Sequence, residues 1–131
     1  MPFRWVETPG TLEIEIEGPD ERAVFVEGFG AMCELLAGDV AERGVTRTVE
    51  LAGRDRAALL ADWLAELAIL GDTEGLVPER LADLELGEEG LRATVEGGRG
   101  TPGRTLKGAN YDRLALERSG EGWVARAVLD R

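Results

Sequence analysis

The sequence predicts an α+β fold in which two amphipathic helices pack on a largely antiparallel β-sheet. Two observations predict it: apolar residues recur at helical spacing in two segments, and they alternate with polar residues in the others. These segments follow one another as strand, helix, strand, helix and then four strands, an order typical of helices packed on an antiparallel sheet. Because no linker divides the 131 residues, residues 1–131 are expected to form a single domain.

The first strand and the first helix are predicted between residues 12 and 38. Leu12, Ile14 and Ile16 alternate with glutamates, the pattern of a strand with one buried and one solvated face. Asp20 is a favourable N-cap, and apolar residues recur behind it at helical spacing as far as Gly38. The apolar positions of this helix are Phe25, Phe29, Met32, Cys33 and Leu36.

The second strand and the second helix follow the same order. Apolar and polar residues alternate over residues 45–51, and Asp55 is placed to cap the helix that follows. The apolar residues of this helix share one face, whereas Asp62 and Glu66 point away from it. The predicted buried face comprises Leu60, Trp63, Leu64, Leu67 and Leu70.

Two hairpins are predicted after Pro78. In the first, alternating apolar residues at 84–86 and 91–95 flank a turn at residues 87–90. In the second, residues 111–117 pair with residues 123–129 around a turn at residues 119–122, where two glycines mark the turn.

The glycine-rich segment 98–105 has the spacing of a phosphate-binding P-loop, with Arg104 at the position of the required lysine. A P-loop follows a buried strand and opens a helix whose N-terminus holds the phosphates. Here Gly108 and Asn110 follow, and the pattern continues as a strand. We therefore interpret the segment as a mobile connection rather than as a nucleotide site.

Composition excludes several classes of function. The chain has no histidine, which removes the commonest general base and the commonest nitrogen ligand of zinc. Its net charge of −11 argues against direct binding of nucleic acid and favours a basic protein partner. A single cysteine, Cys33, is interpreted as a core residue and indicates a reducing, cytoplasmic environment. No membrane span and no signal peptide are expected.

Lys107 is the one lysine among fifteen basic residues, the others being arginines. A lysine carries a compact charge on a thin stem that can enter a pocket, whereas arginine is a flat, permanently charged fork. A functional role is one interpretation. The other is that Lys107 forms an ordinary cross-strand ion pair with Asp130 at the end of the sheet.

Four blocks of sequence carry a resemblance when they are taken together. They are Ala31-Met32, residues 59–67 (LLADWLAEL), residues 106–111 (LKGANY) and residues 122–130 (GWVARAVLD). In order and spacing they resemble the archease family, with its D-W-L-x-E-L helix, its V-K-A-x-T-Y strand and its terminal I-L-D. Archeases are small protein cofactors of the tRNA-splicing ligase that joins RNA ends with GTP and manganese. The resemblance implies an activator of guanylylation and multiple turnover, in tRNA splicing or RNA repair, and not an enzyme.

The resemblance also implies a set of site residues. In the family an aspartate of an N-terminal H-T-A-D motif, the lysine of the V-K-A strand and the last aspartate form the functional cluster. Lys107 and Asp130 match the lysine and the last aspartate, whereas Thr11 stands where the first aspartate would be and Thr8 where the histidine would be. The resemblance implies a divalent cation, calcium or manganese, held by Asp130, the backbone carbonyl of Arg131 and Thr11.

The threonine at position 11 is expected to weaken that cation site, because a hydroxyl replaces a carboxylate among the ligands of a hard cation. Asp39, Glu7 and Asp112 are the acidic residues that could compensate. Two other functions stay open. One is a protein-binding module of the same fold that no longer activates the ligase, and the other is an acidic, ion-binding protein or carboxylate-based hydrolase.

Overall fold

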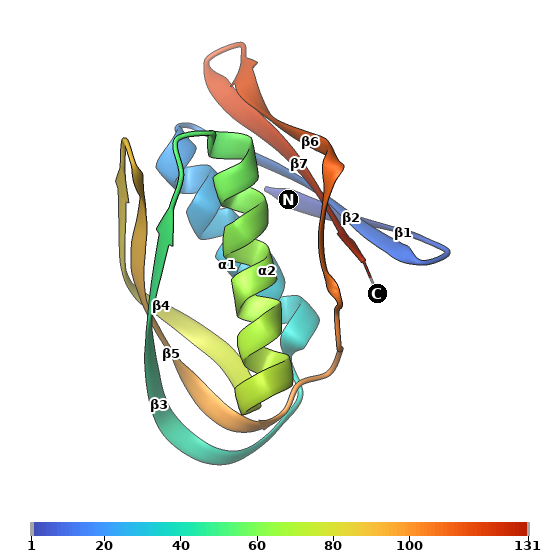
Figure 1. The fold of residues 1–131 in the computed structure, drawn as a ribbon, viewed down its shortest axis with the longest axis vertical. Helices are drawn as coiled ribbons and strands as arrows, with labels where there is room; N and C mark the ends of the chain where they lie inside the picture. The colour runs from blue at the N-terminus through green and yellow to red at the C-terminus, as the bar shows by residue number, and fades with distance from the viewer. Residues whose placement is uncertain (1, 131) are drawn as a thin grey trace.

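Two antiparallel β-sheets enclose a pair of helices in the computed structural model, which describes residues 2–130 apart from the side chain of Asp112 (Figure 1). The four-stranded sheet has the order β1-β2-β7-β6 and the three-stranded sheet the order β3-β5-β4. The elements, in chain order, are β1 (Phe3–Thr8), β2 (Thr11–Gly18), α1 (Glu21–Leu36), β3 (Asp39–Ala52), α2 (Arg56–Glu74), β4 (Leu76–Gly87), β5 (Gly90–Thr101), β6 (Gly108–Ser119) and β7 (Gly122–Asp130).

Both helices begin at the predicted caps. The Asp20 carboxylate accepts a hydrogen bond from the N–H of Ala23 at 2.7 Å, and that of Asp55 accepts one from the N–H of Ala58 at 3.1 Å. Each bond satisfies a backbone donor that the first turn of a helix leaves free. Helix α2 ends at Gly75, whose φ of 69° is the left-handed conformation that glycine adopts without strain.

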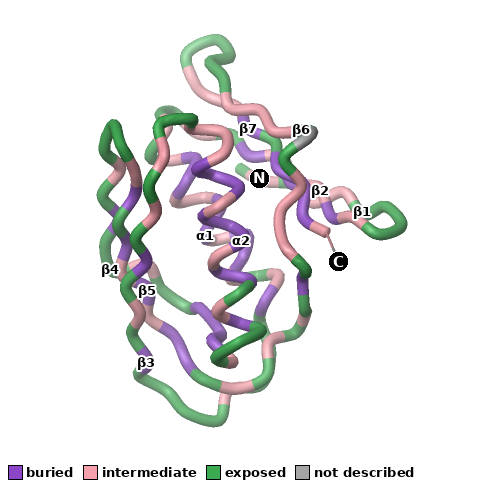
Figure 2. Tube along the Cα trace, viewed as in Figure 1, coloured by how far each residue is buried: buried purple, intermediate pink, exposed green. Residues whose placement is uncertain are grey.

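The core lies between the two sheets and is filled from both helices (Figure 2). Helix α2 contacts both sheets, so it is buried on more than the one predicted face. Besides the predicted Leu60, Trp63, Leu64 and Leu67, its buried residues include Leu59, Ala61, Ala65 and Ala68. Within residues 2–130, neither helix has the length and apolar composition needed to cross a membrane.

Cys33 has the inert character expected of a core residue. It packs against the core cluster from a partly buried position on α1. Burial, together with the negative charge of Glu79, raises the pKa of its thiol to about 12. A thiol with so high a pKa is a poor nucleophile at neutral pH, because the thiolate is the reactive form.

The division into two sheets differs from the single sheet that the sequence predicts. The hairpin β4–β5 pairs with β3, and the hairpin β6–β7 pairs with β2, so the two hairpins do not join each other. The N-terminal strand β1 was also not predicted, since Phe3–Thr8 is short and lies between prolines. Every pairing is antiparallel, as expected.

The first half of the glycine-rich segment, residues 98–101, is strand rather than part of a mobile connection. Residues 97–101 continue β5, and only residues 102–107 connect it to β6. A Cβ atom added to Gly97 would lie 2.2 Å from the carbonyl oxygen of Val77, and one added to Gly100 would lie 2.0 Å from that of Asp39. These glycines therefore serve the close approach of β5 to its two neighbours. A strand follows the segment, so the P-loop interpretation is excluded as expected.

Candidate functional site

The end of β7 lies between the two strands that lead to the other predicted site residues. Asp130 is paired with Thr11 of β2 on one side and with Gly108 of β6 on the other. The backbone N–H of Lys107 donates to the carbonyl oxygen of Asp130 at 2.8 Å. Thr11, Lys107 and Asp130 therefore meet at one corner of the four-stranded sheet, which we call the Asp130 corner.

Lys107 is held in this corner by its backbone and not by its side chain. The side chain is exposed, whereas Thr11 and Asp130 are half-buried. The ion pairs formed within the described residues do not include one between Lys107 and Asp130. The interpretation as a structural ion pair is therefore not supported, and the ammonium group extends into solvent.

Thr11 presents a neutral hydroxyl that is already engaged. The hydroxyls of Thr8 and Thr11 form a hydrogen bond across the turn between β1 and β2. Pro9 and Gly10 occupy the centre of this turn, and Gly10 has a φ of 81°, the conformation that the second central residue of a type II turn requires. The turn thus fixes both threonines at the Asp130 corner.

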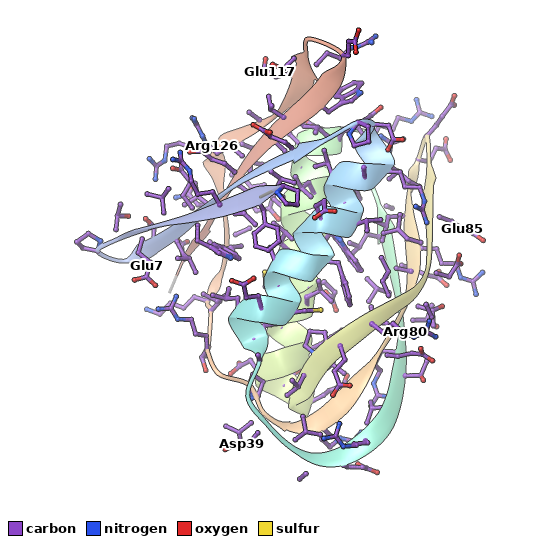
Figure 3. The ribbon with its side chains drawn as sticks, turned by 180° about the vertical axis from the view of Figure 1, so that it is seen from behind. Glu7, Asp39, Arg80, Glu85, Glu117 and Arg126 are labelled. Atoms are coloured by element: carbon purple, nitrogen blue, oxygen red, sulfur yellow. The ribbon has the colours of Figure 1, made fainter. Side chains whose placement is uncertain are left out.

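The residues that could replace the missing carboxylate are not gathered at this corner. Glu7 lies nearby on β1, but its carboxylate binds the guanidinium of Arg104 at 2.5 Å. Asp39 begins β3 in the other sheet, and Figure 3 shows it at the lower end of the molecule, below the projecting β1–β2 hairpin that bears Glu7. Arg131 and the side chain of Asp112 lie outside the described residues.

The donor atoms of the Asp130 corner are oxygens, which a hard cation prefers, but they are too few to fill its coordination shell. A calcium ion takes about six to eight oxygen ligands, several of them anionic. Thr11 and Asp130 supply a hydroxyl and a single carboxylate. Within residues 2–130, no three His, Cys, Asp or Glu side chains gather closely enough to hold a metal ion. The described residues therefore fit weak binding that leaves most ligands to solvent or to a partner.

Tyr111 and Asp62 form a second polar contact, which was not predicted from the sequence. The Tyr111 hydroxyl donates to Oδ1 of Asp62. This hydrogen bond is the main reason why the pKa of Tyr111 rises to about 12, with smaller contributions from burial and from the negative charge of Asp62. The contact ties α2 to β6, the strand that follows Lys107. Both residues lie in blocks that carry the family resemblance, but no spacing rule links them.

Comparison with known proteins relates nearly the whole chain to a single protein family. A model of the archease protein family (MTH1598/TM1083) matches residues 3–130. Protein archease of Methanosarcina acetivorans is 28% identical over 138 residues, covering 98% of this chain and 94% of the relative. Protein archease of Methanopyrus kandleri is 27% identical, with 99% of each chain covered.

Two solved structures have the same fold. The solution structure of Methanobacterium thermoautotrophicum protein 1598 superposes with a TM-score of 0.74 at 26% identity, covering 99% of each chain. The crystal structure of a Thermotoga maritima archease, described as a possible chaperone, has a TM-score of 0.66 at 19% identity and covers 96% of this chain and 94% of its own.

Proposed function

The chain belongs to the archease family, and from this premise we propose that it is a protein cofactor that activates a GTP-dependent tRNA-splicing RNA ligase. It would promote guanylylation of the ligase and repeated turnover, in tRNA splicing or RNA repair. In such a role the ligase, and not this chain, carries out the chemical reaction. A chain without histidine, which lacks the commonest general base at neutral pH, suits that division of labour.

The observation that carries the proposal is the Asp130 corner. Two of its members, Lys107 and Asp130, are the residues that the family resemblance identifies as functional, and the sheet register brings them together with Thr11. Because the Lys107 ammonium has no ion pair with Asp130 and its backbone is fixed, the side chain can extend into a site on another protein. We infer that Lys107 and the Asp130 carboxylate act together on the ligase from neighbouring positions at this corner.

The charge of the chain supports a protein partner of opposite sign. A net charge of −11 repels polyanions, so direct contact with the RNA substrate is not expected. An RNA ligase, in contrast, needs positive charge around its RNA groove to bind the phosphates. Complementary charge would increase the rate of association more than the affinity.

We also propose weak binding of a divalent cation, calcium or manganese, at the Asp130 corner. The ligands on this chain would be the Asp130 carboxylate, the Thr11 hydroxyl and the backbone carbonyl of Arg131. The binding is expected to be weaker than in a corner with two carboxylates, because Thr11 contributes no charge.

Thr11 also favours a second function, a protein-binding module that no longer activates the ligase. The hydrogen bond between Thr8 and Thr11 occupies the hydroxyl that would otherwise take the place of an aspartate. If activation needs the first carboxylate, this chain would bind the ligase without increasing its turnover. A purely ion-binding role has less support, because the acidic residues of the described chain are not clustered.

The decisive experiment measures single- and multiple-turnover RNA ligation by the cognate ligase with this chain and its variants. Lys107→Arg should fold normally and yet lose activation, because the broad guanidinium cannot follow the path of the narrow ammonium. Asp130→Asn should give the same loss, and the double variant should be little worse, since the two residues act as one unit. Arg54→Lys, a conservative change at an exposed side chain in the loop before α2, is the matched control and should activate fully.

Three results separate the alternatives. Full activation by Lys107→Arg would contradict a functional lysine. Ligase binding without activation by the native chain would identify the binding module. Absence of both binding and activation would refute the ligase partnership.

A further inference from the structure

The strand β1 is an edge of the four-stranded sheet that lacks the protection of the other edges. Sheet edges expose unpaired backbone groups, and proteins commonly interrupt them with bulges. The other three edge strands, β3, β4 and β6, all have breaks in register, at Val40/Glu42 and Arg43/Val45, at Pro78/Arg80 and Leu81/Asp83, and at Asn110/Ala115. In contrast, β1 pairs with β2 without interruption from Phe3 to Thr8. The hairpin projects from the molecule in both views (Figures 1 and 3).

The alternation of hydrogen-bonded and outward-pointing positions along β1 shows which of its backbone groups face the open edge. The N–H of Glu17 donates to the carbonyl oxygen of Pro2 at 2.7 Å. In an antiparallel pair, hydrogen-bonded positions alternate with positions whose polar groups point away. The groups of Phe3 and Trp5 therefore point to the open side, where they can pair with an added strand.

Phe3 and Trp5 also line an apolar cavity. Phe3 and Trp5 are opposite Ile16 and Ile14, which are fully buried, so their side chains face the interior between β1 and α1. Together with Glu34 of α1 and with Arg4 they line an open cavity of about 410 Å³. The Trp5 indole nitrogen is buried there and has no hydrogen-bond partner among the described residues.

A strand added to β1 would place its side chains in this cavity. Residues directly opposite each other in a sheet point to the same face. The residue opposite Trp5 would therefore point inward, over the aromatic rings. Edge and cavity thus form one surface, because the backbone and the side chains of Phe3 and Trp5 contribute to both.

The charged residues at the cavity indicate which kind of side chain a partner would place there. Glu34 is exposed at the cavity, and no ion pair involves it within the described part of the chain. The Arg4 guanidinium is bound to Glu15 at 2.8 Å, so it does not neutralise Glu34. A lysine or arginine side chain fits, since its aliphatic stem can cover Phe3 and Trp5 while its cation reaches an aromatic face and the Glu34 carboxylate.

We propose that β1 is a docking edge for an extended segment of a partner protein, which adds as a fifth strand and inserts a basic side chain between Phe3, Trp5 and Glu34. This is the strand-addition mode of recognition, in which the backbone supplies affinity and a pocket for alternate side chains supplies selectivity. The proposal does not depend on the identity of the partner.

The test uses the full chain and a synthetic peptide with the sequence Thr-Val-Thr-Lys-Thr-Val-Thr, blocked at both ends. In a titration followed by NMR, the amide signals of Phe3 and Trp5 should shift, and their hydrogen exchange should slow in the complex. A peptide with glutamate in place of the lysine should bind at least about tenfold more weakly, a difference of about 1.4 kcal/mol.

The chain variants distinguish the pocket from general attraction between charges. Glu34→Lys should weaken binding of the lysine peptide at least about tenfold, about 1.4 kcal/mol, whereas Glu88→Lys, the same change in the exposed β4–β5 turn, should change it little. Equal weakening by the two variants would overturn the proposal, as would shifts that do not involve β1. A dimer formed through β1 in sedimentation without peptide would also overturn it, because a second copy would then occupy the edge.

Discussion

Trp63→Ala should lower the free energy of unfolding by about 3–5 kcal/mol, the range for truncation of a buried tryptophan. Trp63 is fully buried, and its indole N–H donates to the carbonyl oxygen of Phe25 at 3.0 Å. Its ring also stacks with that of Phe29, at 6.0 Å between centroids and 21° between planes. The residue thus joins α2 to α1 in the centre of the core, between the two sheets.

A second variant separates the contribution of the indole hydrogen bond to this loss of stability from that of the aromatic ring. Trp63→Phe keeps an aromatic ring against Phe29 but removes the hydrogen bond, which contributes about 1 kcal/mol net, and leaves a smaller cavity. The carbonyl of Phe25 remains in α1 and keeps a helical partner. We therefore expect a loss of about 1–3 kcal/mol for this variant, within the stability of about 5–15 kcal/mol that a domain has.

Urea unfolding followed by far-ultraviolet circular dichroism measures both losses, with linear extrapolation to water. Fluorescence is less suitable because Trp5 and Trp123 remain in both variants. A loss below about 1 kcal/mol for Trp63→Ala, which is the range of surface substitutions, would refute the reasoning. So would equal losses for the two variants, because the stacking would then contribute nothing.

Four further substitutions test other parts of the structure. Thr11→Asp should strengthen binding of calcium or manganese in a calorimetric titration, since it adds a second carboxylate to the Asp130 corner; an unchanged affinity would place the ion elsewhere. The absorbance of the one tyrosine should titrate near pH 12, and Asp62→Asn should return the midpoint towards about 10. Because the folded state raises this pKa, the stabilisation is complete below about pH 10 and is lost as the pH rises to about 12. Gly100→Ala should destabilise the chain in thermal unfolding by about 1–3 kcal/mol, because the new Cβ meets backbone at 2.0 Å. Gly30→Ala has open space around its Cβ and should instead stabilise α1 by about 0.5–1 kcal/mol.

Local signals predicted most of the elements. The alternation around Ile14 and the caps at Asp20 and Asp55 depend on neighbours in the chain, so they could be recognised before any tertiary contact was known. The glycine-rich end of β5 misled the prediction for the opposite reason. Its glycines were interpreted as a sign of flexibility. Instead, position 100 needs a glycine because the Asp39 carbonyl approaches it from another strand.

The candidate site could be predicted only in part. The resemblance to archeases identified Lys107 and Asp130 and showed that Thr11 departs from the family pattern. It could not show that Lys107 is bound to Asp130 through the backbone alone, nor that the Tyr111 hydroxyl meets Asp62.

The sequence by itself determined most of the helices and strands, where the helices begin, and the main apolar face of each helix, because periodicity and capping act within a few residues. Only the tertiary structure decided that the strands divide into two sheets and that β2 lies beside β7. The β2–β7 pairing joins segments at opposite ends of the sequence, so it is fixed by the packing of both sheets on the helices and not by local pattern. That register places Thr11, Lys107 and Asp130 at one corner, and it leaves β1 as the unbroken edge of the molecule.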